Sequence, residues 1–131
     1  MNNLDKVKQI AWYRAKNKKD EWCHGFITCD LKGNARIYNS ENEKAMFQEV
    51  KIGTIGRDIG IKDTNGVSIF EGDVVKISYK GRNKFGIIES LGYEFSIKDG
   101  NNMYWKITSV PLEVIGNIHD NPELVVRRNN E

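Results

Sequence analysis

The stretch from Ile69 to Ile77, with the sequence IFEGDVVKI, constrains the fold of this chain more than any other feature. It follows Asn65-Gly66, a pair typical of tight turns because both residues tolerate a positive φ angle. A short apolar run leads into an acidic corner at Glu71-Gly72-Asp73, and the residues after this corner alternate in polarity. Small β-barrels begin in this way, so the sequence predicts a chain that is mainly β.

Five short segments downstream of residue 66 have the length and composition of strands. They are separated by turn signals at 80–84 and 99–102, where Gly, Asn and Asp gather. Five antiparallel strands joined by short turns are expected to close on themselves and hide their edges, as in an SH3-like barrel. The predicted strands span residues 74–79, 85–90, 93–98, 103–108 and 112–118. The predicted core contains Val74, Ile77, Ile87, Phe95, Ile97, Trp105, Ile107, Val114 and Ile118.

The N-terminal part of the chain is predicted to form a small β element of its own. Residues 7–13 are compatible with a strand, and a charged connection over 14–20 leads to a hairpin over 21–38. Alternation along the first strand of this hairpin places Trp22, His24, Phe26 and Thr28 on one face. Residues 41–48 favour a short helix because Ser40 and Glu43 resemble a capping box. A loop is the alternative, since two helical turns are marginal without packing.

Composition limits the class of protein. The 131 residues suffice for one domain or for a small barrel with an appended subdomain, and 39% of them are apolar. No apolar run approaches the ~20 residues that span a bilayer, and the polar N-terminus lacks a signal-peptide core, so a soluble protein that stays in the cytoplasm of the cell that makes it is expected. Cys23 and Cys29 would lie about 20 Å apart on one strand, too far for a disulfide, and are predicted to be reduced structural thiols.

No catalytic, metal-binding or cofactor-binding constellation is predicted. Glu71 and Asp73 flank a tight glycine corner, where acids usually cap backbone amides or face water instead of sharing a substrate. Asp63 and its polar neighbours do not follow the order of ligands in a calcium-binding EF-hand loop. The glycines of residues 53–60 lack the Lys-Ser/Thr pair and the helix of a P-loop. The sequence therefore favours a non-enzymatic protein without a cofactor.

Basic residues gather in the N-terminal part, between Lys6 and Lys19, and at a predicted hairpin tip. The tip carries Lys76, Lys80, Arg82 and Lys84, and nearby aromatic residues are Tyr79, Phe85, Tyr93 and Trp105. Small barrels bind single-stranded nucleic acid with cations on phosphates and aromatic rings under bases, which makes this tip a candidate nucleic-acid site. An ordinary solvated turn is the alternative, because a net charge of +2 offers little long-range attraction.

Four segments occur in a characteristic order and spacing. They are GTIG at 53–56, GIKDTNG at 60–66, IFEGDVV at 69–75, and EVIGNI at 113–118 followed by Asn121-Pro122-Glu123-Leu124. Together with Ala11-Trp12, Trp22 and Gly25, they resemble the successive motifs of the YopX family, small proteins of bacterial phages and prophages. The resemblance covers roughly residues 7 to 126.

The resemblance implies an SH3-type barrel in the C-terminal part and a phage or prophage origin, and it implies no activity. It also implies structural roles for the motif residues Gly53, Gly56, Gly60, Asp63, Gly66, Glu71, Gly72, Asp73, Gly116, Asn117 and Pro122.

The sequence thus predicts three parts: an N-terminal β element with a short helix over 1–50, an SH3-like β-barrel domain over 51–126, and a polar tail over 127–131. The function favoured by these features is that of a non-enzymatic phage accessory protein that binds a protein partner of the host or the phage. A nucleic-acid-binding small β-barrel is the alternative. A homo-oligomer is a further expectation, because an unpaired N-terminal strand can add to a neighbouring chain.

Overall fold

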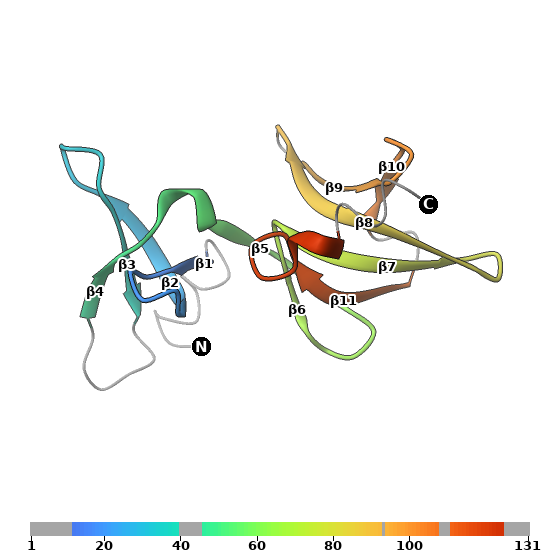
Figure 1. Cartoon of the computed structure of the whole chain (residues 1–131), viewed down its shortest axis with the longest axis horizontal. Helices are drawn as coiled ribbons and strands as arrows, with labels where there is room; N and C mark the ends of the chain where they lie inside the picture. The colour runs from blue at the N-terminus through green and yellow to red at the C-terminus, as the bar shows by residue number, and fades with distance from the viewer. Residues whose placement is uncertain (1–11, 40–45, 93, 108–110, 125–131) are drawn as a thin grey trace. The chain divides into compact units, whose positions relative to one another are not determined.

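The structure is a computed structural model that describes residues 12–39, 46–92, 94–107 and 111–124. The chain divides into two compact units, Met1–Asp58 and Ile59–Glu131. Antiparallel strands dominate both units, and a short 3-10 helix, η1 (Ile52–Thr54), precedes the strand that leads from the first unit into the second (Figure 1). The prediction of a mainly β chain is confirmed.

The first unit contains a meander of four strands: β1 (Tyr13–Lys16), β2 (Trp22–Cys29), β3 (Ala35–Asn39) and β4 (Met46–Glu49). Each strand pairs antiparallel with the next, and β1 also pairs with the first residues of β5 (Gly56–Lys62). The predicted hairpin over 21–38 is confirmed as β2 and β3. Part of the predicted charged connection is the strand β1, in which buried Ala15 alternates with Arg14 and Lys16.

The predicted helix over 41–48 is wrong where the structure describes it. Residues 46–49 form β4, which lies beside β3 with Phe47 opposite Tyr38. The centroids of the two rings are 4.8 Å apart. Strand pairing and this ring contact stabilise residues 46–49, whereas a helix of two turns without packing would be marginal. The capping box of Ser40 and Glu43 lies outside the described residues, and so do residues 7–11 of the strand predicted over 7–13.

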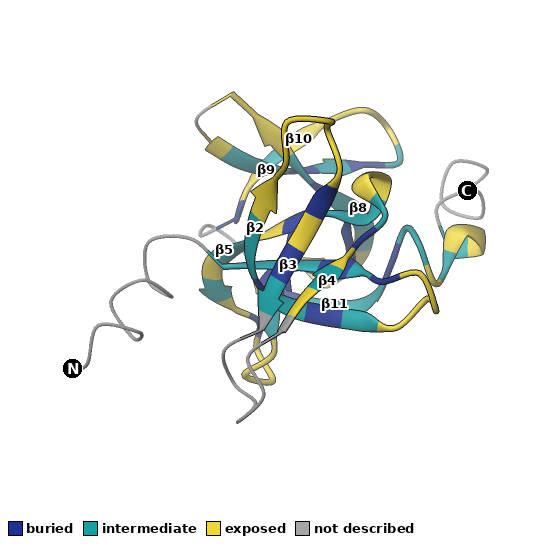
Figure 2. Cartoon of the chain, turned by 90° about the vertical axis from the view of Figure 1, so that its left-hand side faces the viewer, coloured by how far each residue is buried: buried dark blue, intermediate teal, exposed yellow. Residues whose placement is uncertain are grey.

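The core of the first unit lies on one face of its sheet. Buried and accessible residues alternate from Trp22 to Phe26 of β2 and along β3, as Figure 2 shows for β3. The buried side chains are small or aliphatic, and Ile27 and Ile55 pack against them. They are Ala15, Cys23, Ala35, Ile37 and Val50. On β2 and β3 the opposite face carries the aromatic and cationic side chains, which are Trp22, Phe26, Arg36 and Tyr38.

After β5, the second unit contains six strands among its described residues: β6 (Ser68–Phe70), β7 (Asp73–Tyr79), β8 (Arg82–Leu91), β9 (Glu94–Asp99), β10 (Tyr104–Lys106) and β11 (Leu112–Asn117). The last five form one antiparallel sheet in the order β10-β9-β8-β7-β11. The five strands predicted downstream of residue 66 are therefore confirmed in order and orientation. Among the described residues β10 and β11 end this order without pairing to each other, so closure into a barrel is not observed.

The predicted turn over 80–84 is too long. The loop of the β7–β8 hairpin has only two residues, Lys80 and Gly81, and β8 already starts at Arg82. Both loop residues have positive φ angles, of 49° and 74°. This turn sets a register in which Ile88 shares the core face with Ile77. As a result Ile88 is buried, whereas Ile87, which was predicted for the core, is only half-buried.

The rest of the predicted core is largely confirmed. Val74, Ile77, Ile97 and Ile107 are buried, while Phe95, Trp105 and Val114 are partly buried and pack against the core cluster. Ile118 is half-buried. Buried apolar residues of this unit that the predicted core did not contain are Ile69, Phe70, Val75, Ile88 and Leu112.

One loop design occurs four times among the described residues and fixes the ends of the hairpins. In each loop the Oδ1 atom of an Asp or Asn accepts the backbone N–H groups two and four residues later. The residue at the third place after it has a positive φ angle, as expected for a type I turn with a G1 bulge. The loops start at Asn17, Asp30, Asp63 and Asp99, and their positive-φ residues are Asp20, Gly33, Gly66 and Asn102.

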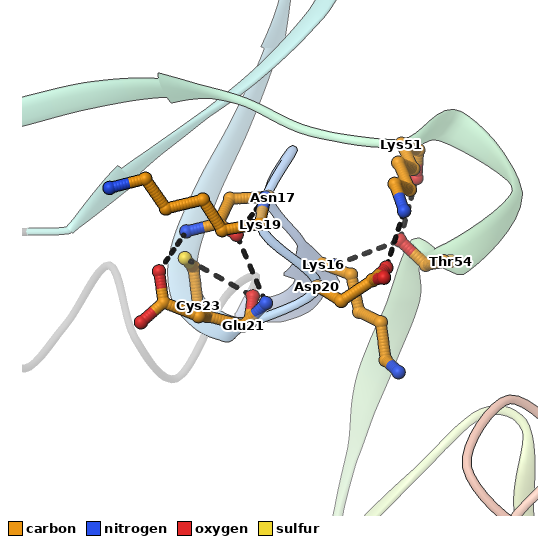
Figure 3. A network of polar contacts seen from close by, with 8 residues as sticks. All are labelled: Lys16, Asn17, Lys19, Asp20, Glu21, Cys23, Lys51 and Thr54. Atoms are coloured by element: carbon orange, nitrogen blue, oxygen red, sulfur yellow. Dashed lines mark hydrogen bonds and ion pairs between the residues drawn. The ribbon is translucent and has the colours of Figure 1, made fainter.

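The loop at Asn17 also ties together distant parts of the first unit (Figure 3). The Nδ2 group of Asn17 donates to Glu21 at 3.1 Å and to Gln48 on β4 at 3.1 Å. On the other side of the loop, Lys51 contacts Asp20, and the backbone N–H of Lys16 donates to Thr54 Oγ1 at 2.8 Å. These bonds fasten the β1–β2 hairpin to the segment around η1.

Candidate functional site

Aromatic and cationic side chains meet at the tip of the β7–β8 hairpin. Tyr79 and Trp105 contact each other edge to face, with ring centroids 5.1 Å apart at 70°. Lys84 Nζ lies 5.2 Å from the centroid of Trp105, and Lys80 Nζ lies 5.2 Å from that of Tyr79. Arg82 pairs across the ladder with Tyr79. These five residues are called the cationic tip, and their contacts lie within the range of cation–π attraction.

Asp99 holds the tryptophan of this tip in place. Its Oδ2 atom accepts the indole Nε1–H of Trp105 at 2.8 Å, and its Oδ1 atom accepts the N–H groups of Asn101 and Met103. Burial alone would raise the pKa of Asp99, but these donors and the nearby Lys84 outweigh it and lower the pKa. The carboxylate therefore stays ionised at neutral pH and fixes the orientation of the ring.

The four cations predicted to form one nucleic-acid site do not share one face. Alternation puts Arg82 and Lys84 on the face of Ile77, whereas Lys76 lies on the opposite face. There Lys76 forms a 3.1 Å ion pair with Glu113 on β11. Phe85 shares the face of Lys76, and Tyr93 lies outside the described residues. The structure thus brings together Lys80, Arg82 and Lys84 with Tyr79 and Trp105.

Open hollows also lie among the described residues of the second unit. A cavity of about 210 Å³ is lined by Val74, Phe85, Ile87 and Leu124, with Glu89, Lys98 and Asn102 at its rim. A larger one of about 360 Å³, called the apolar groove, is lined by Ile59 and Ile61 of β5 with Phe95 and Ile107. Its polar rim consists of Glu94, Ser96 and Lys106.

The acidic motif residues act within the backbone of the second unit. Asp63 Oδ1 accepts from Asn65 and Val67, and its Oδ2 atom accepts the N–H of Val114 on β11 at 2.9 Å. Burial alone would raise the pKa of Asp63, but these three donors outweigh it and lower the pKa. Asp73, fully buried, accepts the N–H of Phe70 at 2.8 Å and so caps the corner that contains half-buried Glu71.

The other motif residues lie at turns and close approaches. Gly72 has a φ angle of 90° and packs under Ile118, and Gly116 lies against the side chain of Asn121. Asn117 Oδ1 accepts the N–H groups of two following residues. Gly66 and Gly60 have positive φ angles, buried Gly56 starts β5, and Gly53 and Pro122 are exposed.

Neither the cysteines nor the acids form a reactive cluster within the described part of the chain. Cys23 is buried and Cys29 is exposed, and both are free thiols. Burial raises the pKa of Cys23, which disfavours its thiolate. Among the described residues no three His, Cys, Asp or Glu side chains stand together as metal ligands, and no helix is long and apolar enough to cross a membrane.

The fold and these surfaces define a small, two-unit antiparallel β protein with aromatic and cationic surface clusters. The chain belongs to the YopX family, whose model, described as YopX protein, matches residues 6–126. It is also similar in fold to the crystal structure of protein EF1440 from Enterococcus faecalis. The two are 21% identical with a TM-score of 0.54, over 88% of this chain and 97% of that one. The chain matches no curated protein.

Proposed function

We propose that this chain is a non-enzymatic accessory protein of a phage or prophage that acts in the host cytoplasm by binding a protein partner. Its second unit is then an SH3-like barrel. Two features support this fold. The strands β7 to β10 form a meander, and β11 returns to pair with β7, the first strand of that meander. Small barrels of the SH3 type share this order, and they commonly serve as binding modules.

The observation that carries the protein-binding proposal is the apolar groove. Its four apolar side chains, Ile59, Ile61, Phe95 and Ile107, leave core surface accessible to a ligand, with Glu94 and Lys106 at the rim. Apolar surface flanked by single charges suits an extended protein segment, which places alternate side chains in such a groove. A nucleic acid would gain little here, because the groove offers one cation and one acid.

Selection of peptides from a random library on the intact protein tests this function. The selected peptides are expected to carry apolar residues at alternate positions. Ile61→Lys and Glu94→Lys each change the groove and should weaken binding at least tenfold. Val67→Lys, at an exposed aliphatic residue outside the groove, should leave it unchanged. Peptides that bind all three variants equally well would contradict a ligand site in this groove.

A second candidate function, nucleic-acid binding by the barrel, is favoured by the cationic tip. A base can stack on the edge-to-face rings of Tyr79 and Trp105, and the lysines beside these rings can bind its phosphate. It ranks second because residues 59–131 carry nine Lys and Arg against ten Asp and Glu, so the unit has no net attraction for a polyanion.

Retention on a single-stranded DNA column at low salt tests the cationic tip. If the cationic tip is the binding site, changing Lys80, Arg82 and Lys84 together to Glu should abolish retention, because three cations become anions. Lys62→Glu, at an exposed lysine of β5, is the matched control and should have a small effect. Equal retention of the triple variant and the wild type would remove this candidate.

A further inference from the structure

The outer face of the first unit carries aromatic residues in a row that crosses its strands. Trp12 and Phe26 contact edge to face at 5.4 Å, Phe26 and Tyr38 stack at 6.5 Å, and Tyr38 and Phe47 lie 4.8 Å apart. The strand register explains the row, because Phe26 lies opposite Tyr38 and Tyr38 opposite Phe47. These four residues are called the aromatic row, and none of them belongs to the buried core of this unit.

Cations lie beside the aromatic row on the same face. Lys16 and Arg14 of β1 pair with Trp22 and His24 of β2, which lie four and two residues from Phe26 on the same face. The guanidinium of Arg14 is 4.7 Å from the Trp22 ring centroid, and Lys16 Nζ is 5.3 Å from it. On the other side of the row, Arg36 lies between Thr28 of β2 and the acid Glu49 of β4. The positive charge that flanks the row is therefore that of Arg14 and Lys16.

We propose that this face is a binding platform for single-stranded nucleic acid, with bases stacked on the aromatic row and phosphates held by Arg14 and Lys16. Sheets that bind single-stranded RNA use exposed aromatic side chains of neighbouring strands to stack successive bases, and basic groups follow the backbone. The inference is independent of the apolar groove and the cationic tip, which belong to the second unit.

Charge and exposure distinguish this face from an ordinary hydrophobic contact between strands. Residues 1–58 carry eleven Lys and Arg against eight Asp and Glu, so the net attraction for a polyanion resides in this unit. Phe47 is 56% exposed, and Trp12, Trp22, Phe26 and Tyr38 are half-buried, so ring faces and edges remain accessible. Cross-strand pairing alone would stabilise the sheet without requiring the flanking cations.

Fluorescence anisotropy of the full chain with labelled oligothymidine and oligouridine of about 12 nucleotides tests the platform. Dissociation constants in the micromolar range are expected at low salt. Phe47→Leu keeps an apolar side chain but removes the ring, and should weaken binding about fivefold or more. Tyr104→Leu, at an exposed aromatic residue of the second unit, is the matched control and should bind like the wild type.

Salt dependence tests the cations of the platform separately. Lys16→Gln should lower the slope of log affinity against log salt by about 0.7, the value for one phosphate contact on a single strand. Lys32→Gln, at an exposed lysine in the β2–β3 loop, should leave the slope unchanged. Absence of binding at low salt would overturn the proposal. Binding that is insensitive to Phe47→Leu and Lys16→Gln, or that is lost only with the changed cationic tip, would overturn it as well.

Discussion

Asp63→Ala is expected to destabilise the second unit by about 3 to 5 kcal/mol in urea unfolding at neutral pH. The carboxylate accepts three backbone N–H groups, two in its own loop and one from Val114 on β11, and the residue is buried. Hydrogen bonds to a charged group contribute about 1.5 to 3 kcal/mol each, and buried donors left without an acceptor incur a desolvation cost. The substitution therefore loosens both a turn and its attachment to β11.

Two variants control for the loop itself. Asp63→Asn keeps the Oδ1 acceptor but puts an amide where Oδ2 accepts from Val114, so an intermediate loss is expected. Asp30→Ala removes the same loop acceptor at an exposed site of the first unit, where water replaces it, and should be far milder. Equal losses for Asp30→Ala and Asp63→Ala would contradict the role given to the bond with Val114.

The effect of Asp63→Ala should also depend on pH in a definite direction. The pKa of Asp63 is lower in the folded protein than in the unfolded chain, where it is about 3.9. The contribution of its charge to stability is therefore complete above that value and is lost as the pH falls through the folded-state pKa. The difference in unfolding free energy between wild type and variant should shrink below about pH 4.

Gly86→Ala is expected to cost about 3 kcal/mol, because an added Cβ has no space. Gly86 lies in the central strand β8 between Val75 and Asp99. A Cβ there would lie 2.6 Å from Ile97 Cγ2 and 2.8 Å from the backbone oxygen of Lys98. The side-chain methyl group can shift, but the carbonyl belongs to the ladder of β9 and cannot move without breaking it.

Gly53→Ala provides the matched control for Gly86→Ala. A Cβ at Gly53 would meet no atom within 4 Å, and the residue has no positive φ angle. Substitution at such a site is neutral or stabilising by up to about 1 kcal/mol, because the unfolded chain loses entropy. A Gly86→Ala protein whose urea midpoint equals that of the wild type would show that β8 and β9 are not packed as described.

The strands of the second unit were predictable because two local signals agree in that region. Alternating apolar residues such as Val75 and Ile77, together with Gly, Asn and Asp at the turns, give both the strands and their order. The family resemblance added the expectation of an SH3-like barrel, and the described residues show no pairing of β10 with β11 that would close it.

Register and side-chain partnership were not predictable from local pattern. Lys80 gives no sequence signal for a positive φ angle, so the two-residue turn was missed, and with it the burial of Ile88. The face shared by Trp22 and Phe26 followed from alternation alone. The binding role proposed for this face also depends on Arg14, Tyr38 and Phe47. Strand pairing between separate segments of the sequence brings these residues to it.

The three tryptophan indole N–H signals provide the most direct test of the proposed nucleic-acid platform. Trp12 and Trp22 lie on the outer face of the first unit, and Trp105 lies at the cationic tip. On titration of the ¹⁵N-labelled full chain with oligothymidine, the signals of Trp12 and Trp22 are expected to shift together while that of Trp105 stays in place. A shift of the Trp105 signal alone, or no shift of any indole signal, would contradict a nucleic-acid platform on the first unit.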